Sequence, residues 1–86
     1  MSYIVYILRT SSNTLYTGQT NNLGKRLKEH KNKTSKSSKY MRSFKSFELV
    51  YEETAKTLSL ALKREMEIKK LSHKQKENLI KANLLT

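Results

Sequence analysis

The chain contains no cysteine, no proline and no tryptophan among its 86 residues, and only two glycines. Without cysteine it can form no disulfide framework, no cysteine-based zinc site and no thiol nucleophile. No apolar run approaches the roughly 20 residues of a membrane-spanning helix, and the N-terminus lacks a signal-peptide pattern. We therefore expect a single cytoplasmic domain over residues 1–86, monomeric unless a partner protein joins it.

Acidic residues are scarce and of one kind. Aspartate is absent, and the seven acids are all glutamate, against 18 lysines and arginines, which gives a formal net charge of +11. A two-metal phosphotransfer site normally needs several converging carboxylates, and this chain has too few. If the protein binds a metal, we expect one hard cation, held by a single glutamate and mostly by water. This kind of site suits Mg2+. The positive excess favours nucleic acid as the partner, ahead of an anionic membrane surface.

Three segments predict β-strands. Residues 3–8 are rich in β-branched and aromatic side chains and predict a strand buried on both faces. A polar turn over residues 9–13 leads to a second strand over residues 14–18, so the two form a hairpin. Residues 47–53 predict the third strand. Gly18 ends the second strand, where we expect it to allow a sharp exit or a close approach of the backbone to a ligand.

Helix signals follow these strands. Residues 20–22 offer N-caps for a helix over residues 23–30, and Thr57 caps a helix over residues 58–71. A third helix follows the capping box at residues 72–75. The order ββαβαα predicts an α+β fold, in which a three-stranded antiparallel sheet is flanked by helices.

Two of the predicted helices carry charged groups where packing favours apolar ones. Glu65 falls on the apolar stripe of its helix, which consists of Leu58, Ala61, Leu62, Ile68 and Leu71. Arg26 and His30 lie beside the leucines of the first helix. A buried carboxylate is costly unless a cation or several donors meet it. Either Arg26 and Glu65 form a partly buried ion pair that ties the helices together, or they are held for a ligand.

The segment over residues 31–46 is strongly basic. Besides Lys31 it contains five candidate nucleic-acid-binding residues, namely Lys33, Lys36, Lys39, Arg42 and Lys45, and it contains no acid. Part of the segment is expected to be a solvated loop. Its cations are expected to contact phosphates and to position a nucleic acid without reading its sequence.

Two tyrosines on the hairpin complete a pattern. Neighbouring tyrosines on adjacent strands are, by themselves, ordinary sheet packing. Here the motifs Ile4-Val5-Tyr6 and Tyr16-Thr17-Gly18 are followed by Arg26, His30 and Glu65. With this ordered set, the sequence from residue 3 to about residue 80 resembles the GIY-YIG nuclease family, and is most similar to its small stand-alone YhbQ-like bacterial branch.

The resemblance implies a metal-dependent DNA endonuclease that hydrolyses phosphodiester bonds, in DNA repair or in the processing of DNA structures. It implies that Tyr6 acts as general base or orients the attacking water, and that Tyr16 positions a phosphate oxygen or assists that water. Arg26 would bind the scissile phosphate, and His30 would take a proton or hold Tyr6. Glu65 would hold a single Mg2+, or Mn2+ in its place. Cations near Tyr6 are expected to lower its pKa.

Other interpretations stay open at this point. A non-catalytic nucleic-acid-binding protein on the same fold, or a basic structural or ribosome-associated module, would carry the same charge. DNA is the expected partner, with RNA as the alternative and no membrane. Two positions depart from the family pattern, because Gln19 stands where some members have lysine and Glu77 where several have asparagine.

Overall fold

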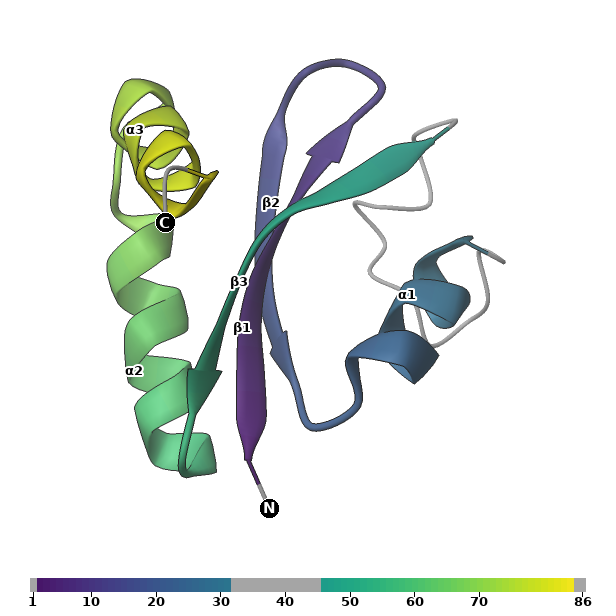
Figure 1. Ribbon diagram of the computed structural model, residues 1–86, viewed down its shortest axis with the longest axis vertical. Helices are drawn as coiled ribbons and strands as arrows, with labels where there is room; N and C mark the ends of the chain where they lie inside the picture. Colours follow the sequence, from purple (N-terminus) through teal and green to yellow (C-terminus); the bar gives the residue numbers. More distant parts are fainter. Residues whose placement is uncertain (1, 32–45, 85–86) are drawn as a thin grey trace.

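The computed structural model describes residues 2–31 and 46–84. The elements are β1 (Tyr3–Thr10), β2 (Leu15–Thr20), α1 (Leu23–Lys31), β3 (Phe47–Ala55), α2 (Leu58–Lys69) and α3 (His73–Leu84). The strands form one antiparallel sheet in the order β2-β1-β3, so β1 is the central strand. Figure 1 shows α2 and α3 along one side of the sheet and α1 on the other. The predicted α+β fold and element order are confirmed.

The central strand is buried on both faces, as its composition predicted. The side chains of residues 5–8 are fully buried. Because side chains alternate along a strand, Val5 and Ile7 pack in an apolar core with side chains of α2 and α3. Tyr6 and Leu8 point to the opposite face and pack with leucines of α1. His30 is also buried. The sheet therefore separates an apolar core from a layer that holds aromatic and polar groups.

The predicted caps are present at all three helices. Asn22 Oδ1 accepts a hydrogen bond from a backbone N–H of the first turn of α1 at 3.1 Å, and Thr57 Oγ1 does the same for α2 at 3.2 Å. Gln75 N donates to Ser72 Oγ at 3.1 Å, and Ser72 N donates to Gln75 Oε1 at 2.9 Å. These bonds fix where each helix begins. Within the described residues, none of the helices is long and apolar enough to cross a bilayer.

The hairpin turn is shorter than the sequence predicts. Arg9 and Thr10 belong to β1, although the sequence predicts a turn there. The reason is that Thr10 N donates to Thr14 O at 2.9 Å, which closes the hairpin two residues later. Asn13 has a φ of 63° and supplies the left-handed turn residue.

The buried face of α2 is rotated from the predicted stripe. Ala61 and Ile68 are fully buried, but Leu58 and Leu62 are 43% and 44% exposed. A three-stranded sheet is too narrow to cover a stripe of that width, so the two leucines lie beyond its margin. Glu65 has a side chain that is 15% exposed. It is therefore mostly buried, as its position on the stripe predicted.

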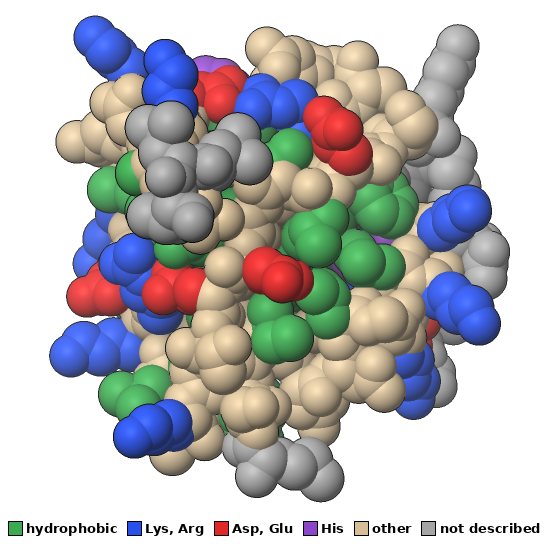
Figure 2. Space-filling model, viewed as in Figure 1, with side chains coloured by type: hydrophobic (Ala, Val, Ile, Leu, Met, Phe, Trp, Pro, Cys, Tyr) green, Lys and Arg blue, Asp and Glu red, His purple; other side chains and the backbone are tan. Residues whose placement is uncertain are grey.

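Lysine and arginine side chains lie mainly along the margin of one face of the molecule (Figure 2). Figure 2 shows hydrophobic side chains gathered near the centre of this face, with lysines and arginines mainly around its margin. Leu49 of β3 is one of the exposed hydrophobic residues, with 39% of its surface accessible. On this face, therefore, the positive charge lies mainly along the edges (Figure 2).

Arg9 and Glu77 join the hairpin to α3. The Nη1 and Nη2 atoms of Arg9 donate to the two carboxylate oxygens of Glu77 at 2.7 and 2.6 Å. His73 Nε2 lies 3.1 Å from the same carboxylate. The hydrogen bonds from Arg9 are the main reason that the pKa of Glu77 falls to about 2; partial burial opposes them, and the charges of Arg9 and His73 add to them. Glu77 therefore has a structural explanation in this fold.

We expect Glu77→Gln to destabilise the protein at neutral pH by about 1 kcal/mol or less, since partly exposed ion pairs contribute little. The pKa of Glu77 lies below its ordinary value of 4.5, so its contribution is complete above pH 4.5 and is lost as the pH falls toward about 2. Thermal unfolding should show a Tm difference between parent and variant at pH 7 that disappears near pH 2.

The matched control is Glu52→Gln, which changes an exposed carboxylate on β3. Its small effect on Tm should not follow this pH dependence. A Glu77→Gln difference that persists undiminished at pH 2 would contradict the stabilising role of the Arg9 pair.

Candidate active site

A glycine of β2 lets a tyrosine of β1 extend across the sheet. Tyr6 and Gly18 are opposite each other in the register of β1 and β2. A Cβ atom on Gly18 would lie 2.6 Å from the Tyr6 hydroxyl oxygen and 2.8 Å from Cζ, so the ring passes directly over the Gly18 backbone. Gly18 lies inside β2 and does not have a positive φ. The predicted sharp exit is therefore wrong, and the close approach at Gly18 is made by the Tyr6 side chain and not by a ligand.

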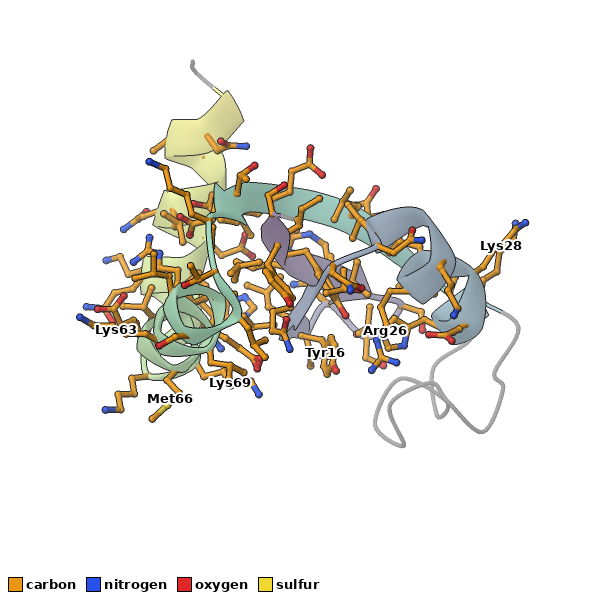
Figure 3. The ribbon with its side chains drawn as sticks, turned by 90° about the horizontal axis from the view of Figure 1, so that it is seen from below. Tyr16, Arg26, Lys28, Lys63, Met66 and Lys69 are labelled. Atoms are coloured by element: carbon orange, nitrogen blue, oxygen red, sulfur yellow. The ribbon has the colours of Figure 1, made fainter. Side chains whose placement is uncertain are left out.

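The Tyr6 hydroxyl meets side chains of β2 and α1. Tyr6 Oη lies 3.2 Å from His30 Nε2. The Tyr16 ring centroid is 6.4 Å from that of Tyr6 and 5.6 Å from that of His30. Arg26, one turn before His30, interacts with the hydroxyl groups of both tyrosines. Figure 3 shows Tyr16 and Arg26 on the same side of the molecule, between α1 and α2. Four of the five candidate catalytic residues thus lie together.

The pKa of Tyr6 is shifted in the direction opposite to the one expected. Burial is the largest cause and raises it; a hydrogen bond from Arg26 lowers it, and the nearby Tyr16 and Glu65 raise it further. The result is a pKa of about 12. Arg26 therefore lowers the pKa of Tyr6, as expected of a nearby cation, but the burial of the ring raises it by more. At pH 7 only about one Tyr6 in 10⁵ would be a phenolate.

His30 is a neutral side chain at its contact with Tyr6. It is 1% exposed. Burial first, and the charge of Arg26 second, hold its pKa below the usual 6.5, while Glu29 acts weakly in the other direction. A neutral imidazole has one donor and one acceptor nitrogen, so Nε2 can accept the Tyr6 proton. Its buried Nδ1 makes no hydrogen bond within the described residues, and such atoms are rare in cores.

Arg26 and Glu65 each have a charged partner on their own helix. Arg26 Nη1 lies 3.4 Å from Glu29 Oε1, and Lys69 Nζ lies 3.3 Å from Glu65 Oε1. This arrangement differs from the interhelical pair that the sequence left open. Glu65 is close enough to the site for its charge to raise the pKa of Tyr6. Figure 3 shows Lys69 extending from α2 on the side where Tyr16 and Arg26 lie.

Glu65 is the residue that fits a metal ion. Within residues 2–31 and 46–84, no three His, Cys, Asp or Glu side chains form a cluster. The Glu65 side chain keeps 15% of its surface exposed, and Lys69, at 55%, has room to turn away. One carboxylate together with water oxygens is a donor set that Mg2+ accepts. The Glu65 carboxylate therefore fits a single hard divalent cation whose other ligands are water.

Some expectations lie outside the described residues, and some features of the site were not predicted. The predicted nucleic-acid-binding residues Lys33, Lys36, Lys39, Arg42 and Lys45 fall in the part of the chain that is not described.

Sequence reasoning missed Lys69, although it follows Glu65 at the spacing of a helical ion pair. It also missed that Gly18 makes room for Tyr6, which the hairpin register would have indicated.

The side chains of the site and the sequence as a whole match a known catalytic domain. Two tyrosines, an arginine and a histidine meet beside the edge of a small antiparallel sheet, with a carboxylate near them. The sequence matches the GIY-YIG catalytic domain over residues 2–78. The chain therefore belongs to the GIY-YIG family, as predicted, and members of this family are generally nucleases.

The relatives are small proteins of similar length. The chain is 49% identical over 79 residues to a UPF0213 protein of Syntrophus aciditrophicus, with 92% of this chain and 90% of that protein covered. It is 44% identical over 82 residues to UPF0213 protein DP2720 of Desulfotalea psychrophila, with 95% and 74% covered. The solution NMR structure of UPF0213 protein BH0048 from Bacillus halodurans has a TM-score of 0.61 and 34% identity, with 95% and 85% covered. These relatives confirm the small stand-alone branch.

We expect Gly18→Ala to destabilise the protein by about 1–3 kcal/mol, as overpacked cores do. The added methyl group would overlap the Tyr6 hydroxyl and ring. The ring must then move, which breaks the 3.2 Å contact with His30. Denaturant unfolding measures the first effect, and the NMR signals of the His30 ring report the second.

Gly24→Ala is the matched control, because a Cβ on this exposed residue of α1 has Asn22 Oδ1 as its nearest contact, at 3.8 Å. It should be neutral or stabilise the helix by up to about 1 kcal/mol. If Gly18→Ala is as stable as the parent and leaves the His30 signals unchanged, the close packing of Tyr6 on Gly18 is wrong.

Proposed function

We propose that the protein is a metal-dependent DNA endonuclease that hydrolyses phosphodiester bonds, acting in the cytoplasm on DNA structures that arise in repair or processing. One observation carries the proposal: Arg26 contacts the hydroxyl groups of Tyr6 and Tyr16 beside a neutral His30. A core optimised for stability would hold apolar groups there, since burying polar groups costs free energy. Membership of the GIY-YIG family supports the same activity.

The side chains supply the parts of a hydrolysis. Arg26 binds an oxygen of the scissile phosphate and offsets the charge that develops in the transition state. Tyr16 positions a phosphate oxygen or the attacking water. Tyr6 takes a proton from that water and gives its own proton to His30 Nε2, 3.2 Å away. Because the proton leaves through His30, Tyr6 need not exist as a free phenolate, a form that its pKa of about 12 makes rare.

Glu65 is the residue that would hold Mg2+, or Mn2+ in its place. When bound, the cation supplies positive charge to a phosphate oxygen and to the leaving 3′ oxygen. The present partner of Glu65 is Lys69, at 3.3 Å on the same helix. Helical ion pairs of this kind contribute only about 0.3–0.5 kcal/mol, so the carboxylate exchanges this partner at little cost.

DNA is the proposed partner, with RNA as the alternative. Basic residues contact the phosphates and position the substrate without reading its sequence. They are Lys33, Lys36, Lys39, Arg42 and Lys45. A second candidate function is nucleic-acid binding without cleavage. The high pKa of Tyr6 favours it, because the burial that raises this pKa also disfavours any negative charge on the phenol oxygen during proton transfer.

We expect Glu65→Ala and Arg26→Ala each to slow cleavage of plasmid and branched DNA in Mg2+ by at least about 100-fold. The first removes the metal ligand and the second the phosphate-binding group. EDTA should stop the parent protein to the same extent. Single-turnover cleavage on gels measures all three, and circular dichroism checks that the variants are folded.

Glu67→Ala is the matched control, because Glu67 is on the same helix, 54% exposed and paired with Arg64 at 3.6 Å. It should cut like the parent. If both site variants cut as well as the parent, the assignment is wrong. If the parent binds branched DNA but cuts nothing with Mg2+ or Mn2+, the binding-only candidate is correct.

The pH profile tests the proton path through His30. Only neutral His30 accepts the proton, and its pKa lies below 6.5, so the single-turnover rate should be constant above about pH 7 and fall tenfold per unit below the His30 pKa. The titratable and charged groups facing His30 are Tyr6, Tyr16, Arg26 and Glu29.

His30→Gln should remove the acid limb of this profile and slow the reaction, whereas His73→Gln, which changes a histidine that is 54% exposed, should leave both unchanged. A rate that rises tenfold per unit from about pH 7 to pH 10 in the parent would assign the base to a free Tyr6 phenolate and contradict the path through His30.

A further inference from the structure

A hollow of about 520 Å³ adjoins the candidate active site, where β2 leads into α1. Figure 1 shows this connection at the same end of the molecule as the start of α2. The residues that line the hollow include Tyr3, Gln19, Asn21, Lys25, Arg26 and Leu58. Its volume is in the range of about 300–1,000 Å³ that is usual for small-ligand sites.

The lining offers three kinds of contact. Tyr3 contributes an aromatic ring, and Leu58, which is 43% exposed, contributes an apolar surface. Gln19 and Asn21 contribute amide groups, and neither side chain is hydrogen-bonded within residues 2–31 and 46–84. An amide presents a donor and an acceptor together, which matches the edge of a nucleobase. Lys25 and Arg26 contribute positive charge, and Glu29, which also lines the hollow, contributes a carboxylate that is paired with Arg26 at 3.4 Å.

Arg26 belongs both to the hollow and to the candidate active site. It lines the hollow, and its guanidinium interacts with the hydroxyl groups of Tyr6 and Tyr16. A nucleotide whose phosphate is held by Arg26 can therefore place its nucleoside in the hollow. This continuity fixes the position of the hollow relative to the bond that would be cut.

We propose that this hollow binds one unpaired nucleotide next to the scissile phosphate, and that Gln19 and Asn21 contact the edge of its base. Cleavage of that phosphate rests on the proposed function, whereas binding of the nucleotide does not. The nucleotide is unpaired because contact of Tyr3 and Leu58 with a base requires an exposed base face, and in a duplex the faces are stacked. A lone phosphate would leave the ring, the leucine and both amides without a contact.

The test is an NMR titration in EDTA, which needs no cleavage. A single-stranded hexadeoxynucleotide, its ribose counterpart and a blunt duplex of the same sequence are added to the full chain. The side-chain amide signals of Gln19 and Asn21 should shift with the single strands, while those of Gln75 and Asn78 on α3 stay in place. The tighter of the two single strands identifies the sugar that the hollow accepts.

Two changes then probe the hollow directly. Replacing one nucleotide of the single strand by an abasic residue should weaken binding roughly tenfold, the scale of one base stacked on an aromatic ring. Gln19→Ala with Asn21→Ala should weaken binding of the intact strand more than that of the abasic strand. Asn78→Ala, at an exposed position on α3, is the matched control and should bind like the parent.

The outcomes separate this proposal from the proposed function. Shifts at Gln19 and Asn21 in a protein that cuts nothing would support the nucleotide site and end the nuclease proposal. Cleavage with no shift at either amide, or with the double variant binding every strand as tightly as the parent, would overturn the nucleotide site alone. Equal shifts with the blunt duplex would overturn the requirement for an unpaired base.

Discussion

The contact between the Tyr6 ring and the Gly18 backbone is the constraint on which the rest of the site depends. Tyr6 belongs to the central strand, and a side chain at position 18 of β2 would overlap its ring and hydroxyl. Without that side chain the hydroxyl crosses β2 and reaches His30 and Arg26 on α1. The same contact keeps the phenol out of water, so the burial that positions Tyr6 also raises its pKa to about 12. Any base chemistry at Tyr6 therefore needs a neighbouring acceptor.

The two faces of the sheet divide stability from chemistry. Val5 and Ile7 point into the apolar core under α2 and α3, while Tyr6 and Leu8 point toward α1, where His30 is buried. Its Nδ1 atom has no hydrogen-bond partner in the part of the chain that the structure describes. β2 is an edge strand of the sheet, so α1 and α2 can both reach the site around it. Glu65 takes this route, since it comes from the helix on the apolar side and still influences Tyr6. A wider sheet would have separated the two helices.

Local signals in the sequence were enough to predict the fold, and they were not enough to predict its contacts. The caps at Asn22, Thr57 and Ser72 depend on residues within three positions of each other, so reading them requires no knowledge of the tertiary structure. Periodicity placed Leu58 in the core of α2, but the width of the sheet decided that it is exposed. The pKa of Tyr6 depends on burial, which no sequence pattern measures. Arg9 and Glu77 lie 68 positions apart and belong to no shared motif, so their pairing could be found only in the structure.

The ion pairs of this protein differ in strength in a way that matches their positions. Arg9 and Glu77 form a bidentate pair at 2.6 and 2.7 Å between two elements, which is the geometry of a permanent link. The charged groups of the site have longer contacts, 3.4 Å from Arg26 to Glu29 and 3.3 Å from Glu65 to Lys69, within single helices. Breaking either of these two ion pairs costs only about 0.3–0.5 kcal/mol. Arg26 and Glu65 can therefore exchange these partners for the proposed phosphate and divalent cation without disturbing the packing of the sheet.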